Sequence, residues 1–362
     1  MIQTSGCLRN LLTQSLHPGS SLSKLAAYCC YTCRLASSLQ QEHKLSDYSD
    51  NEYADLDWDN LGFGITPADY MYITKCSKDK NFEQGKLSRY GNIELSPSAG
   101  GLYEGTKAYR TEEGRILVFR PDQNAMRMKM GAERMCMPSP SIDQFVDAVK
   151  QIALVNKRWV PPPGKGALYI RPLLVGSGPI LGLAPAPEYM FLVYASPEGS
   201  APLNLCIEED FVRATPGGAG GVKAIGNYAP VLKALTRAKN RGFSDVLYLD
   251  SGNVISTPAT NGTILEGITR KSVIDIAHDH GYQVEERLIP VDELIDADEV
   301  FCTGTAVVLA PVGSITYQNR RIEFRTGAGS ACQELYSTLV GIQTGLIEDK
   351  KGWTIEIPHQ IN

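Results

Sequence analysis

Residues 217–228 read GGAGGVKAIGNY, a glycine-rich loop that carries one lysine, Lys223, and one tyrosine, Tyr228. A P-loop requires Ser or Thr directly after its lysine, and Ala224 stands there instead. The dinucleotide fingerprint is also absent, because no strand ending in GxGxxG opens a helix with an acidic residue at the right distance. The loop therefore presents a lysine beside a tyrosine without a nucleotide-binding motif.

Two interpretations of Lys223 follow from its surroundings in the sequence. A lysine whose pKa falls in a desolvated pocket can form a Schiff base, as the lysines of pyridoxal phosphate (PLP) enzymes do. A solvated lysine on a glycine-rich surface loop is the simpler interpretation, and the spacing alone favours it. The loop by itself leaves both open.

An alternation of apolar strands and helices surrounds this loop and predicts an α/β (α+β) protein. ILVFR (116–120) is expected to form a strand, and 121–135 an amphipathic helix. Ser141 and Gln144 have capping-box spacing ahead of a helix that ends near Arg158. Further strands are expected at 167–176, 188–197, 245–250, 253–257 and 299–308, and further helices at 227–241, from Thr269 and at 331–347.

Composition limits the class of protein. The chain has 362 residues, enough for two domains at roughly 100–200 residues each. Its 35 basic and 40 acidic residues give a net charge of -5, which excludes the strongly basic footprint of a nucleic-acid binder. No unbroken apolar stretch approaches the roughly 20 residues that a membrane-spanning helix needs. Neither nucleic acid nor a membrane is expected as a partner.

The amino-terminal residues differ in composition from the rest of the chain. Residues 1–41 contain arginine, serine, leucine and cysteine but no acidic residue, which predicts an organelle transit peptide, with a disordered tail as the alternative. RLASS (34–38) resembles a processing site, so the mitochondrion is the first expectation and the chloroplast the second. Residues 42–60 are acidic and polar and are expected to lead into the folded part.

The cysteines do not predict a metal site. Cys30 and Cys33 have CxxC spacing, and Cys29 precedes them, but no second pair follows at zinc-site spacing. His278 and His280 fit no metal spacing and are expected on the surface.

Several other residues are candidates for binding an anion. Thr269 stands before a predicted helix, where its hydroxyl and the first backbone N–H groups could bind an anion or where it could simply cap the helix. Thr305 and Ala306 follow an apolar strand and could supply further backbone donors. Arg120 ends a predicted strand, where it could meet a phosphate or only solvent.

Tyr169 and Arg171 alternate along a predicted strand, which places both side chains on one face. Such a pair could receive a carboxylate or could lie on the surface of an edge strand.

Taken together and in this order, these segments resemble the branched-chain amino acid aminotransferases, which are fold-type IV PLP enzymes. The resemblance runs from about Glu52 to the C-terminus. The strings that carry it are EYADLDWDNLGF (52–63), RYGNIELSPSAG (89–100), FRPDQNAMRMKMGAERMCM (119–137), WVPPPGKGALYIRPLL (159–174), GGAGGVKAIGNYAPVLKA (217–234), GTILEGITRKS (262–272) and EVFCTGTAVV (299–308).

The resemblance implies a two-domain fold with PLP between an N-terminal α/β domain (61–197) and a C-terminal PLP-binding domain (207–362), joined by a linker (198–206). It implies a homodimer. The implied reaction is reversible transfer of the amino group between Leu, Ile or Val and 2-oxoglutarate, so the partners are amino acids, 2-oxo acids and glutamate.

The resemblance also assigns site residues. Lys223 matches the lysine that bonds covalently to PLP and moves the proton of the substrate α-carbon, and Tyr228 matches the tyrosine at the PLP phenolate oxygen. The implied phosphate site is formed by Arg120, Ile268, Thr269 and Thr305. The implied substrate site is formed by Tyr103, Tyr169, Arg171, Thr305 and Ala306. No metal is implied.

Three segments usual in this family are missing, after Gly100, after Pro197 and after Ser251. The third normally carries the glutamate that pairs with the pyridinium nitrogen of PLP, and losing one preorganised catalytic charge can cost about 10²–10³ in rate. Two alternatives to an active aminotransferase follow. One is an impaired or inactive isoform that still dimerises, and the other is a fold-type IV enzyme with another substrate.

Overall fold

The computed structural model describes residues 52–62, 65–93, 100–179, 184–198, 203–208, 210, 212–215, 217–248, 254–255, 262–287 and 289–358. The expected transit peptide (1–41), its cysteines and most of the acidic segment 42–60 lie outside the described residues. Residues 51–362 form one compact unit, and the expected linker at 198–206 stays a prediction. No helix in the described part of the chain is long and apolar enough to cross a membrane.

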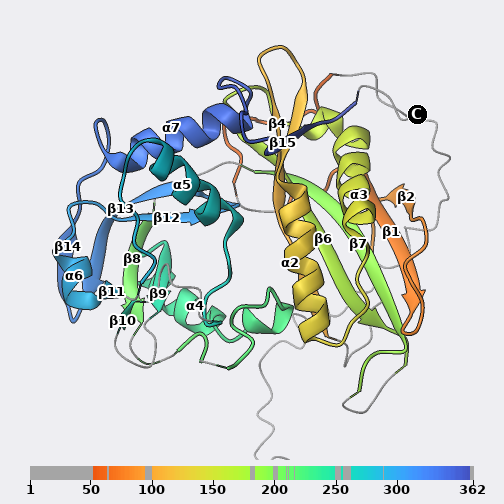
Figure 1. The fold of residues 1–362 in the computed structure, drawn as a ribbon, viewed down its shortest axis with the longest axis horizontal. Coiled ribbons are helices and arrows are strands. Elements are labelled where there is room, and N and C mark those ends of the chain that lie inside the picture. The colour runs from red at the N-terminus through yellow and green to blue at the C-terminus, as the bar shows by residue number, and fades with distance from the viewer. Residues whose placement is uncertain are drawn as a thin grey trace, which may run out of the picture. The chain divides into compact units, whose positions relative to one another are not determined.

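An eight-stranded antiparallel sheet forms the first half of this unit (Figure 1). Its strand order is β15-β5-β4-β6-β7-β1-β2, and β3 also pairs with β6. The strands are β1 (Tyr70–Ser77), β2 (Lys86–Arg89), β3 (Gly101–Tyr103), β4 (Thr106–Arg110), β5 (Ile116–Phe119), β6 (Ala167–Ser177), β7 (Glu188–Glu198) and β15 (Thr354–Glu356).

Two helices, α2 (Pro121–Arg134) and α3 (Ile142–Val155), pack on each other, and α3 packs on β1, β6 and β7. The buried face of α3 follows the i, i+3, i+4, i+7 spacing and includes the fully buried Phe145 and Ile152. Phe145 lies against Phe191 of β7 with a ring-centroid distance of 5.7 Å. The capping box at Ser141 is confirmed, so the start of α3 is set by its own sequence.

The second half contains a five-stranded mixed sheet of order β12-β13-β8-β9, with β14 paired to β13. Its strands are β8 (Leu203–Glu208), β9 (Asp245–Tyr248), β12 (Phe301–Gly304), β13 (Val308–Tyr317) and β14 (Arg320–Glu323), and β10 (Val254–Ile255) pairs with β11 (Ile289–Pro290). Its helices are α4 (Leu232–Asn240), α5 (Ile268–Asp279), α6 (Val291–Ile295) and α7 (Ala331–Gln343), and a short 3-10 helix spans Ile225–Asn227. Helix α5 packs against α7 and β12.

The boundaries of three elements expected from the sequence were wrong. The helix expected at 227–241 begins only at Leu232. The strand expected at 299–308 is a hairpin, because β12 ends at Gly304 and β13 begins at Val308. The closing helix ends at Gln343 rather than at residue 347, since Gly345 adopts a left-handed φ of 76° just past the helix end.

Candidate active site

A short backbone pairing holds the glycine-rich loop against the first sheet. Leu102 of β3 forms an antiparallel bridge with Ala224, and the Tyr103 N–H donates to the Lys223 carbonyl oxygen at 3.1 Å. Inside the loop, the Asn227 side-chain amide donates to the carbonyl oxygens of Ala219 (2.7 Å) and Val222 (2.9 Å). The loop is therefore anchored, and the simple interpretation of a solvated lysine on a surface loop does not hold.

Two tyrosines surround the lysine amine. The Lys223 Nζ lies 4.4 Å from the ring centroid of Tyr103 and 5.5 Å from that of Tyr228. These two rings lie edge to face, with centroids 4.9 Å apart. Burial lowers the pKa of Lys223 below its usual value, and the nearby Arg127 and Arg171 guanidinium groups act in the same direction. Lys223 is therefore neutral at a lower pH than an ordinary lysine.

The pKa values of Tyr103 and Tyr228 shift in opposite directions. Burial would raise the pKa of Tyr228, but the Lys223 ammonium, a hydrogen bond with Tyr103 and the Arg213 guanidinium lower the pKa overall. Burial raises the pKa of Tyr103, and its hydrogen bond to Tyr228 adds to this rise. Tyr228 is thus the better stabilised phenolate of the pair, and it suits a hydrogen bond with a ligand oxygen.

Arg171 extends the same aromatic cluster. Its guanidinium carbon lies 4.6 Å from the Tyr103 ring centroid and 4.8 Å from that of Tyr169. Among the residues that the structure describes, no carboxylate forms an ion pair with Arg171. The guanidinium is therefore held in place by stacking while its hydrogen-bond donors remain available for a carboxylate.

A cavity of about 180 Å³ opens beside Arg171. It is lined by Ile65, Tyr169, Arg171, Tyr194, Ser196, Glu198 and Ala306. The expected shared face of Tyr169 and Arg171 is thus observed, and Ala306 of the β12–β13 turn reaches the same cavity. Burial raises the pKa of Tyr169 to about 12, so its hydroxyl stays protonated at neutral pH. The lining combines aromatic surface with one cation, one buried carboxylate and a backbone turn.

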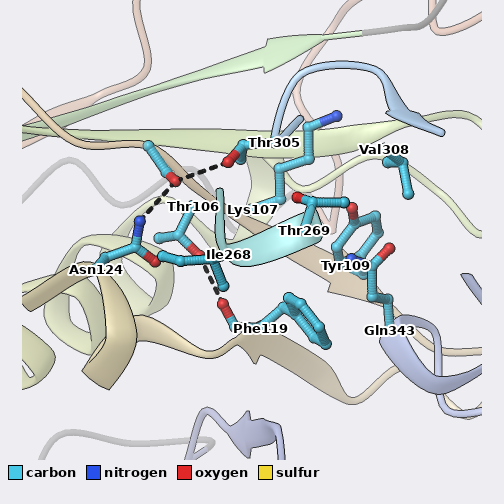
Figure 2. Close-up of a pocket in the computed structure, with 11 residues that line it drawn as sticks. Thr106, Lys107, Tyr109, Phe119, Asn124, Ile268, Thr269, Thr305, Val308 and Gln343 are labelled. Carbon is cyan, nitrogen blue, oxygen red and sulfur yellow. Dashed lines mark hydrogen bonds between the residues drawn. The ribbon is translucent and has the colours of Figure 1, made fainter. Parts of the chain in front are cut away.

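A second, smaller cavity lies at the start of α5 (Figure 2). Ile268, Thr269 and Thr305 line it, together with the buried Tyr109. Gly267 is the N-cap of α5, and no side chain caps the helix. The interpretation of Thr269 as an ordinary cap is therefore wrong, and its side chain faces the cavity beside the first backbone N–H groups of the helix (Figure 2).

Arg120 lies beside this cavity without lining it. It is buried, and its backbone adopts a left-handed conformation with φ 47° and ψ 47°. Its Nη1 donates to Ser272 Oγ of α5 at 2.7 Å, and its guanidinium stacks on the Trp353 ring at 4.8 Å. A non-glycine residue in this region is held against its own preference, so the surrounding contacts fix where this cation lies.

A set of buried charges was not predicted from the sequence. Glu104 is fully buried, and its carboxylate accepts hydrogen bonds from Arg127 (2.7 and 2.8 Å) and from Asn124 (2.7 Å). Lys107 and Glu198 form a second buried pair. The sequence does contain a signal for these buried charges. In GLYEGTKAYR (101–110), Glu104 and Lys107 interrupt a run of buried strand residues.

The family model of class IV amino-transferases matches residues 101–315 of this chain. The branched-chain-amino-acid aminotransferase 2, chloroplastic, of Arabidopsis thaliana is 64% identical over 389 aligned positions, which cover 99% of this chain and 100% of that protein. The mitochondrial branched-chain amino acid aminotransferase 1 of Humulus lupulus is 58% identical, with 99% and 100% covered. Because this chain has 362 residues, the 389 positions of the first alignment include some where the relative has a residue and this chain has none.

A solved structure agrees with these relatives. The branched-chain amino acid aminotransferase from Escherichia coli superposes with a TM-score of 0.67 at 25% identity, covering 80% of this chain and 99% of that chain. The chain therefore belongs to the class IV aminotransferases, in the branch of the branched-chain amino acid aminotransferases.

PLP is the cofactor of this family, and the described residues fit it. The Tyr109 hydroxyl is buried at the small cavity and has no hydrogen-bond partner among the described residues. Such a donor, with two threonine side chains and a helix start, suits a phosphate. The half-buried amine of Lys223, with its lowered pKa, suits a covalent link to an aldehyde.

We expect Lys223 of the cofactor-free protein to react with an acylating reagent at lower pH than an ordinary lysine. Only the neutral amine reacts, and burial brings its pKa below the usual 10.5. The measurement is the labelling rate of the Lys223 peptide by mass spectrometry between about pH 6 and 11, a range that spans the titration of a lysine with a lowered pKa, with the exposed Lys129 as control. A midpoint for Lys223 at or above that of Lys129 would contradict the lowered pKa.

Proposed function

We propose that this protein is a PLP-dependent branched-chain amino acid aminotransferase that transfers the amino group reversibly between Leu, Ile or Val and 2-oxoglutarate. The observation that carries the proposal is the placement of Lys223 between Tyr103 and Tyr228, next to Arg171. The family membership of the chain supports the same reaction.

In this proposal the small cavity holds the PLP phosphate. Ile268 and Thr269, at the start of α5, would hold the PLP phosphate together with Thr305, and Arg120 would supply positive charge from its place beside Ser272 of α5. The Tyr228 hydroxyl would donate to the phenolate oxygen of PLP, as its lowered pKa suits. When bound, PLP supplies the electron sink for cleavage of the substrate Cα–H bond.

Lys223 is the general base and acid. Burial lowers the pKa of its amine and so favours the neutral form, which takes the proton from the substrate α-carbon and returns it on the cofactor side. The Tyr103 ring covers one side of this amine and excludes water from the proton's path.

The larger cavity receives the rest of the substrate. The Thr305–Ala306 backbone donates to the α-carboxylate, and the rings of Tyr103 and Tyr169 contact an aliphatic side chain. Arg171 binds the second carboxylate when glutamate or 2-oxoglutarate takes the same place. Stacked between the two tyrosines, the arginine serves an anionic substrate without removing the apolar walls that a leucine side chain needs.

The comparisons do not favour the alternatives of an inactive isoform or another substrate, since the relatives named above are branched-chain amino acid aminotransferases. The missing third segment, which in this family carries the glutamate that pairs with the pyridinium nitrogen of PLP, still predicts a lower catalytic rate for this chain. Residues 249–253, next to that junction, lie outside the described residues.

A homodimer belongs to the proposal. Exposed apolar side chains on α2, at Met126 and Met130, and near the lysine loop, at Ile225 and Leu232, support burial against a second copy. Sedimentation equilibrium is expected to give twice the 39.5 kDa of one chain, and a single-chain mass would refute the dimer.

An organelle is the location that the relatives' names support, since one is named chloroplastic and another mitochondrial. We propose the mitochondrion, because of the arginine-containing, acid-free residues 1–41. A fluorescent fusion to the C-terminus of the full chain tests this, and fluorescence in plastids would overturn it.

The two-domain division, with a linker at 198–206, is proposed on the resemblance to the branched-chain amino acid aminotransferases.

Turnover of the full chain with leucine, 2-oxoglutarate and PLP tests the proposal. The expected products are 4-methyl-2-oxopentanoate and glutamate. Lys223→Ala is expected to lower the rate by at least about 10²-fold, because proton transfer loses its base. The variant is also expected to lose the PLP mass that borohydride reduction fixes on the wild-type chain. Turnover at the wild-type rate in this variant would show that the lysine is misassigned.

Arg171→Gln is expected to discriminate between the two substrate classes. A hydrogen bond to a charged group contributes about 1.5–3 kcal/mol, so kcat/KM for 2-oxoglutarate should fall on the order of 10- to 100-fold. The half-reaction with leucine should change much less, since leucine has no second carboxylate. Arg158→Gln is the matched control, because Arg158 pairs with Asp69 outside both cavities. Equal losses for both substrates would contradict the assigned role of Arg171.

A further inference from the structure

Lys107 and Glu198 form a buried ion pair that has no role in the reaction proposed above. Lys107 Nζ lies 2.7 Å from Glu198 Oε1, and the two side chains are only 7% and 9% exposed. Lys107 belongs to β4 and Glu198 is the last residue of β7, with β6 between these strands. The pair therefore spans three strands of the sheet.

The strand register places this pair on the face of the substrate cavity. Lys107 is opposite Tyr169, which is opposite Ser196, and Glu198 is two residues beyond Ser196 on the same strand. Paired residues, and residues two apart in a strand, share one face of a sheet. Glu198 accordingly lines the cavity that contains Arg171.

The same lysine also reaches the turn of the second sheet. Lys107 Nζ donates to the Ala306 carbonyl oxygen at 2.6 Å. The neighbouring Thr305 hydroxyl donates to the Gly105 carbonyl oxygen at 3.2 Å (Figure 2). Two hydrogen bonds thus tie consecutive residues of the β12–β13 turn to the start of β4, and they fix the orientation of its peptide groups.

The effect of burial on the two pKa values explains why Lys107 needs Glu198 as a partner. Burial lowers the pKa of Lys107 and raises that of Glu198, and the attraction between the two groups opposes both shifts. A buried charge without a partner is costly, so removing either member penalises the other. Glu198 therefore keeps the Lys107 ammonium where it meets the Ala306 carbonyl.

We propose that Lys107 and Glu198 are positioning residues for the substrate α-carboxylate, because their ion pair holds Lys107 on the Ala306 carbonyl and so orients the Thr305–Ala306 turn. This inference rests on the proposed function in one respect, namely the assignment of the turn to the α-carboxylate. Neither residue takes part in proton transfer, and the pair acts through the turn.

The test separates carboxylate binding from the rest of the site. Binding of 4-methylvaleric acid, which has the leucine side chain and carboxylate but no amine, is measured calorimetrically on the PLP-loaded full chain. The alcohol 4-methyl-1-pentanol is the matched probe without a carboxylate. Lys107→Met is expected to weaken binding of the acid about tenfold, the equivalent of about 1.4 kcal/mol, and to leave binding of the alcohol unchanged. Lys107→Arg should restore part of the affinity for the acid.

Glu198→Gln provides a second variant of nearly the same shape, for use if Lys107→Met does not fold. It is expected to weaken binding of the acid less than Lys107→Met does, again without an effect on the alcohol. Arg158→Met, which breaks an ion pair outside both cavities, should change neither probe. Unchanged binding of the acid, or equal weakening of acid and alcohol, would overturn the positioning role. A wild-type chain that binds the acid but does not transaminate would refute the proposed function alone.

Discussion

The site depends on one backbone contact, the bridge between Leu102 of β3 and Ala224 of the glycine-rich loop. This bridge, with the hydrogen bond from the Tyr103 N–H to the Lys223 carbonyl, brings a segment from the second half of the chain onto the first sheet. Once the loop is attached, the Lys223 amine faces the Tyr103 ring and is partly removed from water. The lowered pKa of the lysine follows from that burial, so its chemistry is a consequence of sheet pairing.

Buried charges then connect the two halves around the lysine. Arg127 of α2 bonds to Glu104 and also donates to the Glu266 carbonyl, just before α5. Lys107 of β4 forms an ion pair with Glu198 and donates to the Ala306 carbonyl. Both cations therefore have a carboxylate partner from the first half and a backbone partner from the second half. Such contacts fix geometry more than they add stability, because burying charges is itself costly.

Much of the architecture could be predicted from local sequence. The capping box at Ser141, the alternation of Tyr169 and Arg171, and the helix that starts near Thr269 are all present in the structure. The hairpin inside 299–308 could not be predicted, because its turn is stabilised by contacts with Gly105 and Lys107, which are 200 and 199 residues away in the chain. An apolar run does not reveal a turn whose partners are so distant.

The sequence by itself determined the family, the strand and helix order of the central segments, and which residues are candidates for the site. It did so because motifs such as GGAGGVKAIGNY (217–228) and helix caps are local patterns. Only the tertiary structure decided that Lys223 is half-buried rather than solvated, that Thr269 faces a cavity instead of capping its helix, and that Lys107 and Glu198 form a pair. Burial, pKa and ion pairing depend on what lies nearby in space, and sequence spacing does not contain that information.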